Sequence, residues 1–508
     1  MASAYKTPGV YIVEKNAFPN SVVEVATAVP AFIGYTKIAD NKGTSLTRKP
    51  WRITSMSEFV NYYGGPSDDT FEFTKNPDAT AASDFKSGGD GYTLKRKNEK
   101  PDTFRYYLYH SMQLFFQNGG GPCYIVSVGP YSDSGAEMKP LQAGIDLLLK
   151  EQEPTMVVIP DAMALPQGDC ISLQQYSLKH CGFQMKNRFA ILDITDGYRE
   201  TTDPAGNCVA AFRGDLGTNF LNYSAAYYPW LNTSIVQTTD LGFANFVDLS
   251  KVKELLLAEA GGEAAPQDLK DILSQVGDAA RDPKAKTYLS DDELHKILFS
   301  ISATYANILL AMKRKLNLLP PGAAMAGVFT MVDNARGVWK APANVSLASV
   351  VSPAVNITHD EQEDLNVTTA GKSINAIRSF IGEGTLVWGA RTLDGNSLDW
   401  RYINVRRTMI MIEESLRLAT KAYVFEPNVS STWVTIKSMA SNFLTGIWKR
   451  GGLAGASPED AFSVSVGLGE TMTPEDILEG MLRVTILVAL SRPAEFIEIT
   501  FQQQMQKS

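Results

Sequence analysis

The chain has 508 residues, of which 44% are hydrophobic, 10% aromatic and 20% charged. This ordinary globular composition excludes a disordered, collagen-like or low-complexity chain. The 47 Lys and Arg residues against 55 Asp and Glu residues give a net charge of −8, which argues against a nucleic-acid-binding function. The four cysteines show no CxxC spacing, so we expect reduced thiols and synthesis in a reducing cytoplasm.

The sequence predicts neither export by a signal peptide nor direct membrane insertion. The N-terminus has no apolar stretch after a basic start, as a signal peptide would. The apolar run at 486–490 is much shorter than the roughly 20 residues of a membrane-spanning helix. If the protein acts outside the cell, we therefore expect lysis to release it.

The first part of the chain alternates short extended segments with turns. Residues 9–14 (GVYIVE) have the pattern of a short strand, and residues 29–35 that of a buried strand. The polar, glycine-rich residues 86–100 predict an exposed loop or hairpin. Residues 104–116 predict a helix, which ends at Asn118 and the three glycines after it.

Strands and helices then alternate through the middle of the chain, which predicts a mainly parallel layer and an α/β fold of mixed α+β character. We predict strands at 123–128, 155–159, 189–193 and 219–230, and helices at 141–150 and 168–181.

The second half predicts longer helices. Residues 258–286 are rich in Ala, Gly and charged residues and indicate a solvent-facing helical insertion. Residues 293–318 predict one long amphipathic helix that ends at two prolines and a glycine. We further predict helices at 402–424 and 431–450, and a buried strand at 483–490.

No catalytic, cofactor-binding or metal-binding constellation is found in the sequence. The GKS sequence at 371–373 resembles half of a phosphate-binding loop, but Asn366 occupies the position where that loop needs a glycine. The four histidines are far apart and form no HExxH motif. Asp161 and Asp193 follow buried strands, where enzymes of this class keep catalytic groups. Helix capping is the favoured interpretation of both.

Both chain ends carry a strand-forming segment next to a breaker, and each can add to the sheet of a neighbouring subunit. At the C-terminus, FIEITFQ at 496–502 alternates apolar and polar residues with the period of a strand. Pairing of both segments within the chain's own sheet remains an alternative. The predicted inter-subunit arm residues are Val10, Tyr11, Ile12, Val13, Phe496, Ile497, Ile499 and Phe501.

Segments from near the start to near the end of the chain resemble, in the same order, those of contractile tail sheath proteins. This family includes the sheaths of contractile phage tails, of R-type pyocins and of extracellular phage-tail-like injection systems, and the chain is most similar to the last group. The matching segments are PGVYIVE at 8–14, VPAFIGYT at 29–36, PPGAAMAGVFTMVDNARGVWKAPAN at 320–344, GEGTLVWGARTL at 382–393, WRYINVRRTMIMIEESL at 400–416 and RPAEFIEITFQQ at 492–503.

The resemblance implies a discontinuous inner α/β domain built from both chain ends, with inserted outer α/β regions and strand arms at both termini. The expected boundaries are 1–25 for the N-terminal arm, 26–50 plus 390–490 for the inner domain, 51–115 for an inserted subdomain, 116–389 for the outer domain and 491–508 for the C-terminal arm.

The resemblance also implies a mechanism. Subunits form hexameric rings that stack helically around an inner tube, and the extended sheath contracts to drive the tube through a target envelope. The implied partners are further copies of the chain, the inner tube protein, and baseplate and terminal cap proteins. The particle would be assembled in the bacterial cytoplasm and released by lysis or anchored in the cell.

Two sets of basic residues are candidates for assembly contacts. Lys437, Lys449 and Arg450 could present a basic face to the tube, or could be solvated residues of a core helix. Arg406 and Arg407 are candidates for ion pairs within or between subunits, which contribute about 0–1 kcal/mol each at a surface.

The residues leave two other functional classes open. A static helical or capsid-like shell would use the same arms, and an α/β enzyme would have a site that the motifs do not reveal.

Overall fold

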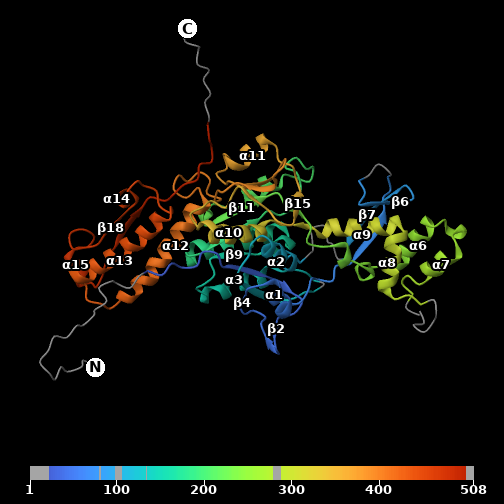
Figure 1. The fold of residues 1–508 in the computed structure, drawn as a ribbon, viewed down its shortest axis with the longest axis horizontal. Helices are drawn as coiled ribbons and strands as arrows, with labels where there is room; N and C mark the ends of the chain where they lie inside the picture. The colour runs from blue at the N-terminus through green and yellow to red at the C-terminus, as the bar shows by residue number, and fades with distance from the viewer. Residues whose placement is uncertain (1–21, 79–81, 98–105, 133, 279–287, 499–508) are drawn as a thin grey trace, which may run out of the picture. The chain divides into compact units, whose positions relative to one another are not determined.

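The structure is a computed structural model of the chain, and it describes residues 22–78, 82–97, 106–132, 134–278 and 288–498. The chain divides into two compact units. The larger unit is Ala26–Arg407, and the smaller unit combines Met1–Val25 with Thr408–Ser508 (Figure 1).

A nine-stranded mixed sheet forms the centre of the larger unit, which confirms the predicted α/β fold. Its six central strands are parallel, from β16 to β8, and antiparallel strands lie at both edges. Every residue of β1, β9, β10 and β11 is buried, as expected for parallel strands covered on both faces. In spatial order the strands are β14 (Val345–Ser346), β17 (Gly384–Trp388), β16 (Asn375–Phe380), β11 (Ser224–Tyr228), β10 (Phe189–Asp193), β9 (Met156–Val158), β1 (Pro30–Thr36), β8 (Cys123–Pro130) and β4 (Trp51–Ile53).

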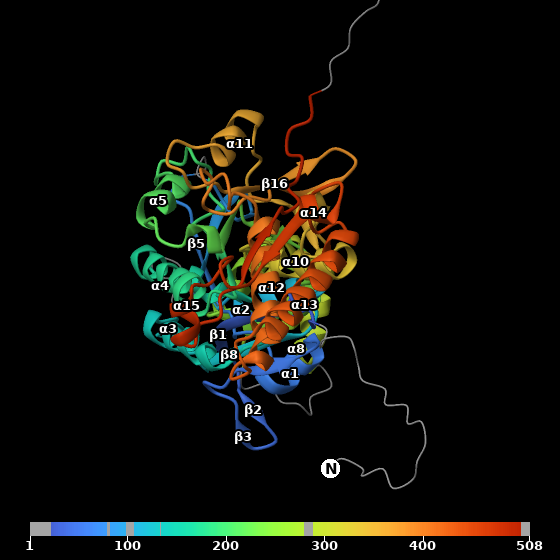
Figure 2. The ribbon, with the colours of Figure 1, turned by 90° about the vertical axis from the view of Figure 1, so that its left-hand side faces the viewer.

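Helices cover both faces of this sheet: α3 (Met138–Leu147) and α4 (Gln167–Lys179) on one face, and α2 (Leu108–Gln117) and α10 (Gly322–Arg336) on the other. In Figure 2, α3 and α4 lie to the left of β1, and α2 and α10 to its right. Neighbouring side chains of β1 show the same division. Phe32 packs against Phe115 of α2, whereas Ile33 lies beneath Gly144 of α3. A Cβ at Gly144 would stand 2.6 Å from Ile33, so only glycine permits this approach of α3.

A second hydrophobic core lies in the same unit, where a three-stranded sheet packs against four helices. It is the lobe on the right of Figure 1. The polar segment predicted as a loop or hairpin at 86–100 supplies two of its strands. The elements are β5 (Phe71–Lys75), β6 (Phe85–Ser87), β7 (Asp90–Arg96), α6 (Leu249–Glu259), α7 (Gln267–Ser274), α8 (Asp291–Ile301) and α9 (Ala303–Leu316).

The prediction of one long helix at 293–318 is wrong, because α8 and α9 are two helices that meet at 105°. The break falls at Ser302, whose hydroxyl accepts a hydrogen bond from the backbone N–H of Tyr305 at 3.0 Å and caps α9. A serine that bonds the backbone in this way begins a new helix rather than continuing the old one. The apolar pattern continues across the break because both helices face the same core.

Shorter elements complete the larger unit. The predicted strand at 219–230 is shorter than expected, since only Ser224–Tyr228 is extended. The remaining elements are β2 (Asp40–Asn41), β3 (Thr44–Ser45), α1 (Met56–Tyr63), α5 (Cys208–Asp215), β12 (Leu231–Thr233), β13 (Leu318–Leu319), β15 (Val350–Pro353) and α11 (His359–Asn366).

The smaller unit is helical with one short sheet. The helices predicted at 402–424 and 431–450 are confirmed as α12 (Ile403–Thr420), which begins in the larger unit, and α13 (Ser430–Lys449). The strand predicted at 483–490 is shorter, and alternate side chains are exposed rather than buried. The other elements are α14 (Pro458–Ala461), β18 (Phe462–Ser465), α15 (Pro474–Leu478) and β19 (Thr485–Val488).

The two compact units divide the chain differently from the expected domain boundaries, since residues 26–407 form one unit and only 408–490 of the expected inner domain lie in the other. Residues 26–50, expected with the C-terminal region, pack with the larger unit, because β1 lies in the middle of the nine-stranded sheet. Within the described ranges, no single helix is long and apolar enough to cross a membrane. The bent pair α8–α9 meets that test of length and composition.

Two buried carboxylates hold the starts of the two helices on one face of the sheet. Asp161, just after β9, accepts hydrogen bonds from the backbone N–H groups of Tyr107 at 2.6 Å and Leu108 at 3.1 Å, where α2 begins. Asp193, the last residue of β10, accepts one from Gly322 at 2.7 Å, where α10 begins. A Cβ at Gly322 would stand 2.7 Å from the Asp193 carboxylate. Both aspartates therefore cap helices, but helices distant in sequence.

Burial sets the ionisation of both groups. It raises the pKa of Asp161 to about 6 and that of Asp193 to about 7, against the lowering effect of the N–H donors. Between the ordinary value of 3.8 and this raised pKa, the folded chain holds a proton on Asp193 that the unfolded chain has lost. The stability that Asp193 contributes therefore falls as the pH rises through this interval.

We expect Asp193→Asn to gain stability over the wild type as the pH rises to about 7, with a constant difference above that value. Asparagine keeps an oxygen for the Gly322 N–H but cannot ionise. Asp193→Ala should instead cost about 1–3 kcal/mol, because it leaves that buried N–H unpaired. Urea unfolding from pH 5 to pH 8 measures both, with the exposed Asp169→Asn as the control. A pH-independent difference for Asp193→Asn would contradict the assignment.

Candidate assembly surfaces

The side chains that resemble catalytic motifs take part in folding. Lys372 of the GKS sequence is buried and donates to the backbone carbonyl of Arg213. Burial lowers the pKa of Lys372. Asp161 and Asp193 are held by helix N-termini. Within the described ranges, no group of three or more His, Cys, Asp or Glu side chains is arranged to hold a metal ion.

Arg407, a predicted ion-pair residue, forms a buried ion pair within the larger unit. Its guanidinium donates to both carboxylate oxygens of Asp333 on α10, at 2.9 and 2.6 Å, and to the carbonyl of Thr27 at 2.9 Å. It also lies 4.7 Å from the centre of the Phe329 ring. The side chains of Arg407 and Asp333 are 4% and 1% exposed, so this is not the surface pair that the sequence analysis expected.

Arg406, the other predicted ion-pair residue, is held by aromatic rings. Its guanidinium lies 4.4 Å from the ring centre of Trp400 and 4.6 Å from that of Tyr223. Such cation–π contacts stabilise by about 2 kcal/mol or more when desolvated, and Arg406 is buried. Neither ring is predicted as a partner from the sequence, although Trp400 opens the same sequence block.

The sequence blocks that carry the family resemblance converge in this region. Asp333 and Trp339 come from the block at 320–344, and Asn404 and Arg407 from the block at 400–416. The Asn404 side chain donates to the carbonyl of Trp339 at 2.8 Å, beside the Arg407–Asp333 pair. Arg391, from the block at 382–393, forms a β-bridge with Tyr402. The blocks therefore form one packed region.

The three candidate tube-facing residues differ in their surroundings. All three are exposed, on or just after α13. Arg450 forms an ion pair with Glu24, and Lys437 lies 4.0 Å from Glu470. Lys449 has no ion pair with any described residue of the chain. Whether these residues face a tube stays a prediction, and Lys449 is the member of the set whose charge is uncompensated.

The ion pair of Arg450 also holds the N-terminal arm, because Glu24 is close to the end of that arm at residue 25. The backbone N–H of Val25 in this segment also donates to the hydroxyl of Ser415 on α12, at 3.1 Å. These contacts fix the base of the arm within the smaller unit. The arm residues Val10 to Val13 lie outside the described residues.

The two-stranded sheet of β18 and β19 offers open edges. The strands pair antiparallel from Phe462 with Val488 to Ser465 with Thr485, and no third strand joins them among the described residues. Leu487 of β19 is 65% exposed. An isolated two-stranded sheet is marginally stable in water, and its outer N–H and C=O groups are a template for another chain.

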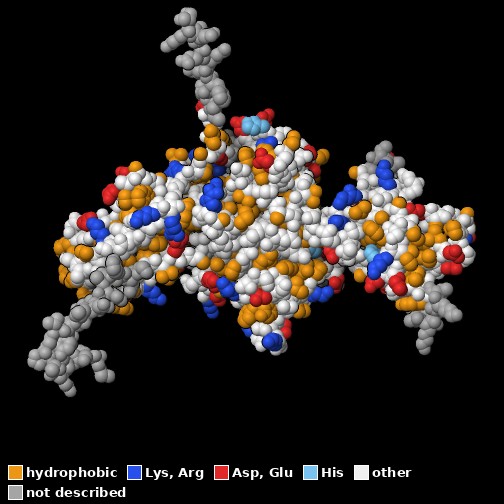
Figure 3. All heavy atoms as spheres, in the orientation of Figure 1, with side chains coloured by type: hydrophobic (Ala, Val, Ile, Leu, Met, Phe, Trp, Pro, Cys, Tyr) orange, Lys and Arg blue, Asp and Glu red, His pale blue; other side chains and the backbone are white. Residues whose placement is uncertain are grey.

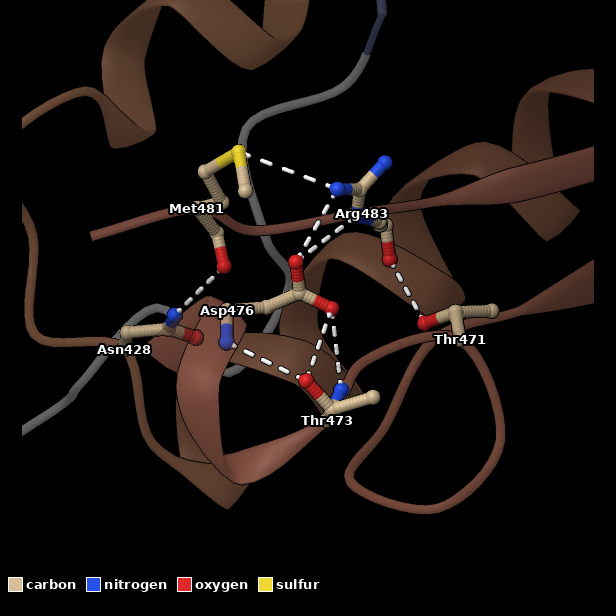
Figure 4. Close-up of polar contacts among 6 residues, drawn as sticks. All are labelled: Asn428, Thr471, Thr473, Asp476, Met481 and Arg483. Carbon is tan, nitrogen blue, oxygen red and sulfur yellow. Dashed lines mark hydrogen bonds and ion pairs between the residues drawn. The ribbon is translucent and has the colours of Figure 1, made fainter. Parts of the chain in front are cut away.

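A hydrogen-bond network fixes the approach to β19 (Figure 4). Thr473 and Asp476 form a capping box at the start of α15, with bonds of 3.0 and 3.3 Å. The Arg483 guanidinium donates to the Asp476 carboxylate at 2.9 Å. The backbone carbonyl of Arg483 accepts a hydrogen bond from the Thr471 hydroxyl at 2.7 Å. The N–H of Thr473 and the Arg483 guanidinium hold the pKa of Asp476 below its ordinary value. Since Arg483 stands two residues before β19, this network helps to position the strand.

The described part of the C-terminal arm forms no strand within its own chain. Residues 491–498 are non-helical and extend from β19, with Phe496 and Ile497 exposed by 74% and 79%. Ile499 and Phe501 lie outside the described residues. Two bulky apolar side chains at this exposure are typical of a segment that acquires a partner.

Comparison with known proteins shows which class of protein the chain is similar to. A family model for the phage tail sheath C-terminal domain matches residues 396–504. The tail sheath protein of Enterobacteria phage T4 is 24% identical over 162 residues, which are 30% of this chain and 24% of that protein. The chain thus spans about a quarter of the length of the curated relatives it matches. By these matches and by its fold, the chain is similar to contractile tail sheath proteins.

Similarity over the full length is found with sheaths of contractile injection systems. The sheath of the extracellular contractile injection system PVC, solved in a contracted state, is 27% identical with a TM-score of 0.60, covering 99% of both chains. The helical sheath of the anti-feeding prophage, also contracted, is 26% identical with a TM-score of 0.59, covering 98% of this chain and 100% of that one. The chain is therefore similar in fold and in length to structural sheath subunits of this kind.

We expect Arg407→Ala to destabilise the larger unit by about 3–5 kcal/mol, because it leaves the Asp333 carboxylate buried without its partner. The double variant Arg407→Met with Asp333→Leu should recover much of this loss, since it removes both charges. Urea unfolding measures both. Arg52→Ala is the control, because Arg52 forms an exposed pair with Glu153 at 3.2 Å and should cost less than about 1 kcal/mol. A similar cost at the two arginines would contradict the buried-pair interpretation.

Proposed function

We propose that the chain is the sheath subunit of an extracellular, phage-tail-like contractile injection system. It polymerises as stacked hexameric rings around an inner tube and contracts from an extended state to drive the tube through a target envelope. The observation that carries the proposal is the similarity over 99% of both chains to a sheath solved in its contracted state. The structural role of these relatives also supports a non-enzymatic function.

Exchange of strand arms holds the polymer together in this proposal. The N-terminal arm (Val10 to Val13) and the C-terminal arm (Phe496 to Phe501) of neighbouring subunits add to the open edges of the β18–β19 sheet. The unpaired edges, the exposed Phe496 and Ile497, and the anchored base of the N-terminal arm all support this arrangement. Each subunit donates its arms in a head-to-tail sense, so the contact is heterologous and builds rings or open helices.

The arms also explain how a lattice can shorten without dissociating. Paired strands keep neighbouring subunits connected while the globular units change their packing. The work of contraction comes from better subunit packing in the contracted state, without nucleotide hydrolysis. We retain the inner domain of 26–50 plus 390–490 and the outer domain of 116–389 as proposals for the parts that touch the tube and face outward.

The proposed partners are further copies of the chain, the inner tube protein, and baseplate and terminal cap proteins. The similarity to a chain in the structure of the anti-feeding prophage baseplate, at 27% identity and with a TM-score of 0.58, supports a place in such an assembly. The particle assembles in the bacterial cytoplasm and acts outside the cell after release. The basic residue that faces the tube is Lys449, supported by its exposure and uncompensated charge.

Electron microscopy of the purified full-length chain tests the proposed function. We expect tubes of two diameters, corresponding to extended and contracted sheaths. Tubes of a single invariant diameter would indicate a static shell, and small uniform particles would contradict polymerisation altogether.

Deleting residues 1–20 should leave a folded monomer that does not polymerise, because the open sheet edges then lack their N-terminal arm. Circular dichroism and thermal unfolding test the fold, and sedimentation tests assembly. Normal tubes from this truncated chain would overturn the arm-exchange proposal.

A point substitution tests the register of the C-terminal arm. Ile497→Asp places a charge on the apolar face and should raise the protein concentration needed for polymerisation at least about tenfold. Glu498→Ala, on the opposite face of the same segment, is the matched control and should polymerise normally. Equal effects of the two substitutions would exclude an alternating strand.

A further inference from the structure

We propose that a groove between β6, α9 and β15 receives helix α11 of a neighbouring copy of the same chain. The inference rests on the proposed function, which brings many copies into one lattice, and adds a second contact that is independent of the arms. Both surfaces belong to the larger unit.

The groove has a volume of about 720 Å³. One wall is a single face of α9, where Leu310, Lys313 and Arg314 recur at helical spacing. Lys86 of β6 and Val351 of β15 complete the rim. With Phe85, which also lines it, the groove combines three basic side chains with three apolar ones.

The positive charge of the groove is not neutralised by its own acidic residue. Asp84 is the acidic member of the lining, and its carboxylate lies 3.3 Å from the ammonium group of Lys315 and accepts the backbone N–H of Leu94 at 2.7 Å. Lys86 is exposed and has no ion pair with any residue that the structure describes. A partner with carboxylates would complete this surface.

The apolar part of the groove is also uncovered. Leu310 is 46% exposed and Val351 is 71% exposed. Val351 lies in β15, an edge strand of a three-stranded sheet. The surface thus fits a protein segment that carries both carboxylates and an apolar side chain better than it fits a simple anion.

Helix α11 of the same chain presents this combination. Asp360 and Glu363 are exposed and make no hydrogen bond or ion pair through their carboxylates with the described part of the chain. The carboxylates of Glu361 and Asp364 are engaged, the first in the helix cap and the second with a buried arginine. Val367, directly after the helix, is 60% exposed. Positions 360, 363 and 367 follow the i, i+3, i+7 spacing of one helix face.

Charge and apolar complementarity together select a second copy of this chain as the occupant. Asp360 and Glu363 meet Lys86 and Lys313, and Val367 covers Leu310 and Val351. Figure 3 shows acidic and histidine side chains gathered over α11. It also shows basic side chains where the lobe of α9 and β7 meets the rest of the larger unit. Because these patches are different, the contact is heterologous and can propagate through a helical lattice.

Charge reversal in the full-length chain tests the contact. Lys86→Glu with Lys313→Glu, and separately Asp360→Lys with Glu363→Lys, should each raise the concentration needed for polymerisation at least about tenfold, because like charges then face each other. The chain with all four substitutions should polymerise at close to the wild-type concentration. A mixture of the two reversed chains should also form tubes. Sedimentation and electron microscopy measure assembly, and thermal unfolding checks each fold.

Lys139→Glu with Lys179→Glu is the matched control, since it changes the net charge equally at two exposed lysines outside the groove. Tubes from the wild type and this control report on the proposed function, whereas the reversed chains report on the contact. Normal assembly of either reversed chain would overturn the inference. Failure of both the fourfold variant and the mixture to assemble would also overturn it, and would indicate a different acidic partner.

Discussion

The buried ion pair between Arg407 and Asp333 is the interaction on which the packing of the larger unit depends. Arg407 is the last residue of the larger unit, and its guanidinium also binds the carbonyl of Thr27, one residue after that unit begins. The chain passes from one unit to the other at two points. On the larger unit, these two points therefore lie next to each other. Asp333 ties this point to α10, which packs on the central sheet. One side chain thus joins both chain segments to the core.

A buried ion pair is an expensive way to make such a junction, because desolvation of two charges offsets most of their attraction. What the ion pair contributes is a fixed geometry. The planar guanidinium donates to two carboxylate oxygens and a carbonyl in fixed directions, which an apolar contact would not specify. The capping carboxylates of Asp161 and Asp193 follow the same logic, since each fixes where a helix begins on the sheet. Buried polar groups thus define positions within a core that apolar packing fills.

The sequence predicted the elements well and their junctions less well. The alternating strands and helices around β9 and β10 follow from local patterns, and the α/β layer follows from them. The break at Ser302 was missed because the apolar pattern runs through it, and only the hydroxyl bond to Tyr305 ends the helix. The burial of Arg407 was missed because its partners, Asp333 and Thr27, are 74 and 380 residues away in sequence. The sequence segments that resemble the sheath family point to the region around Arg407, but only the fold shows which residues Arg407 contacts.

The open edges of β18 and β19 have a consequence for the subunit before it is incorporated. Free strands recruit any compatible strand, so a pool of newly made subunits is liable to premature, irregular association. Short strands limit this risk, since each offers only four residues. Ordered growth then requires that a template supply the first correctly oriented strand faster than stray encounters do. In the proposed assembly, the edge that receives a neighbour's strand therefore also makes control of nucleation necessary.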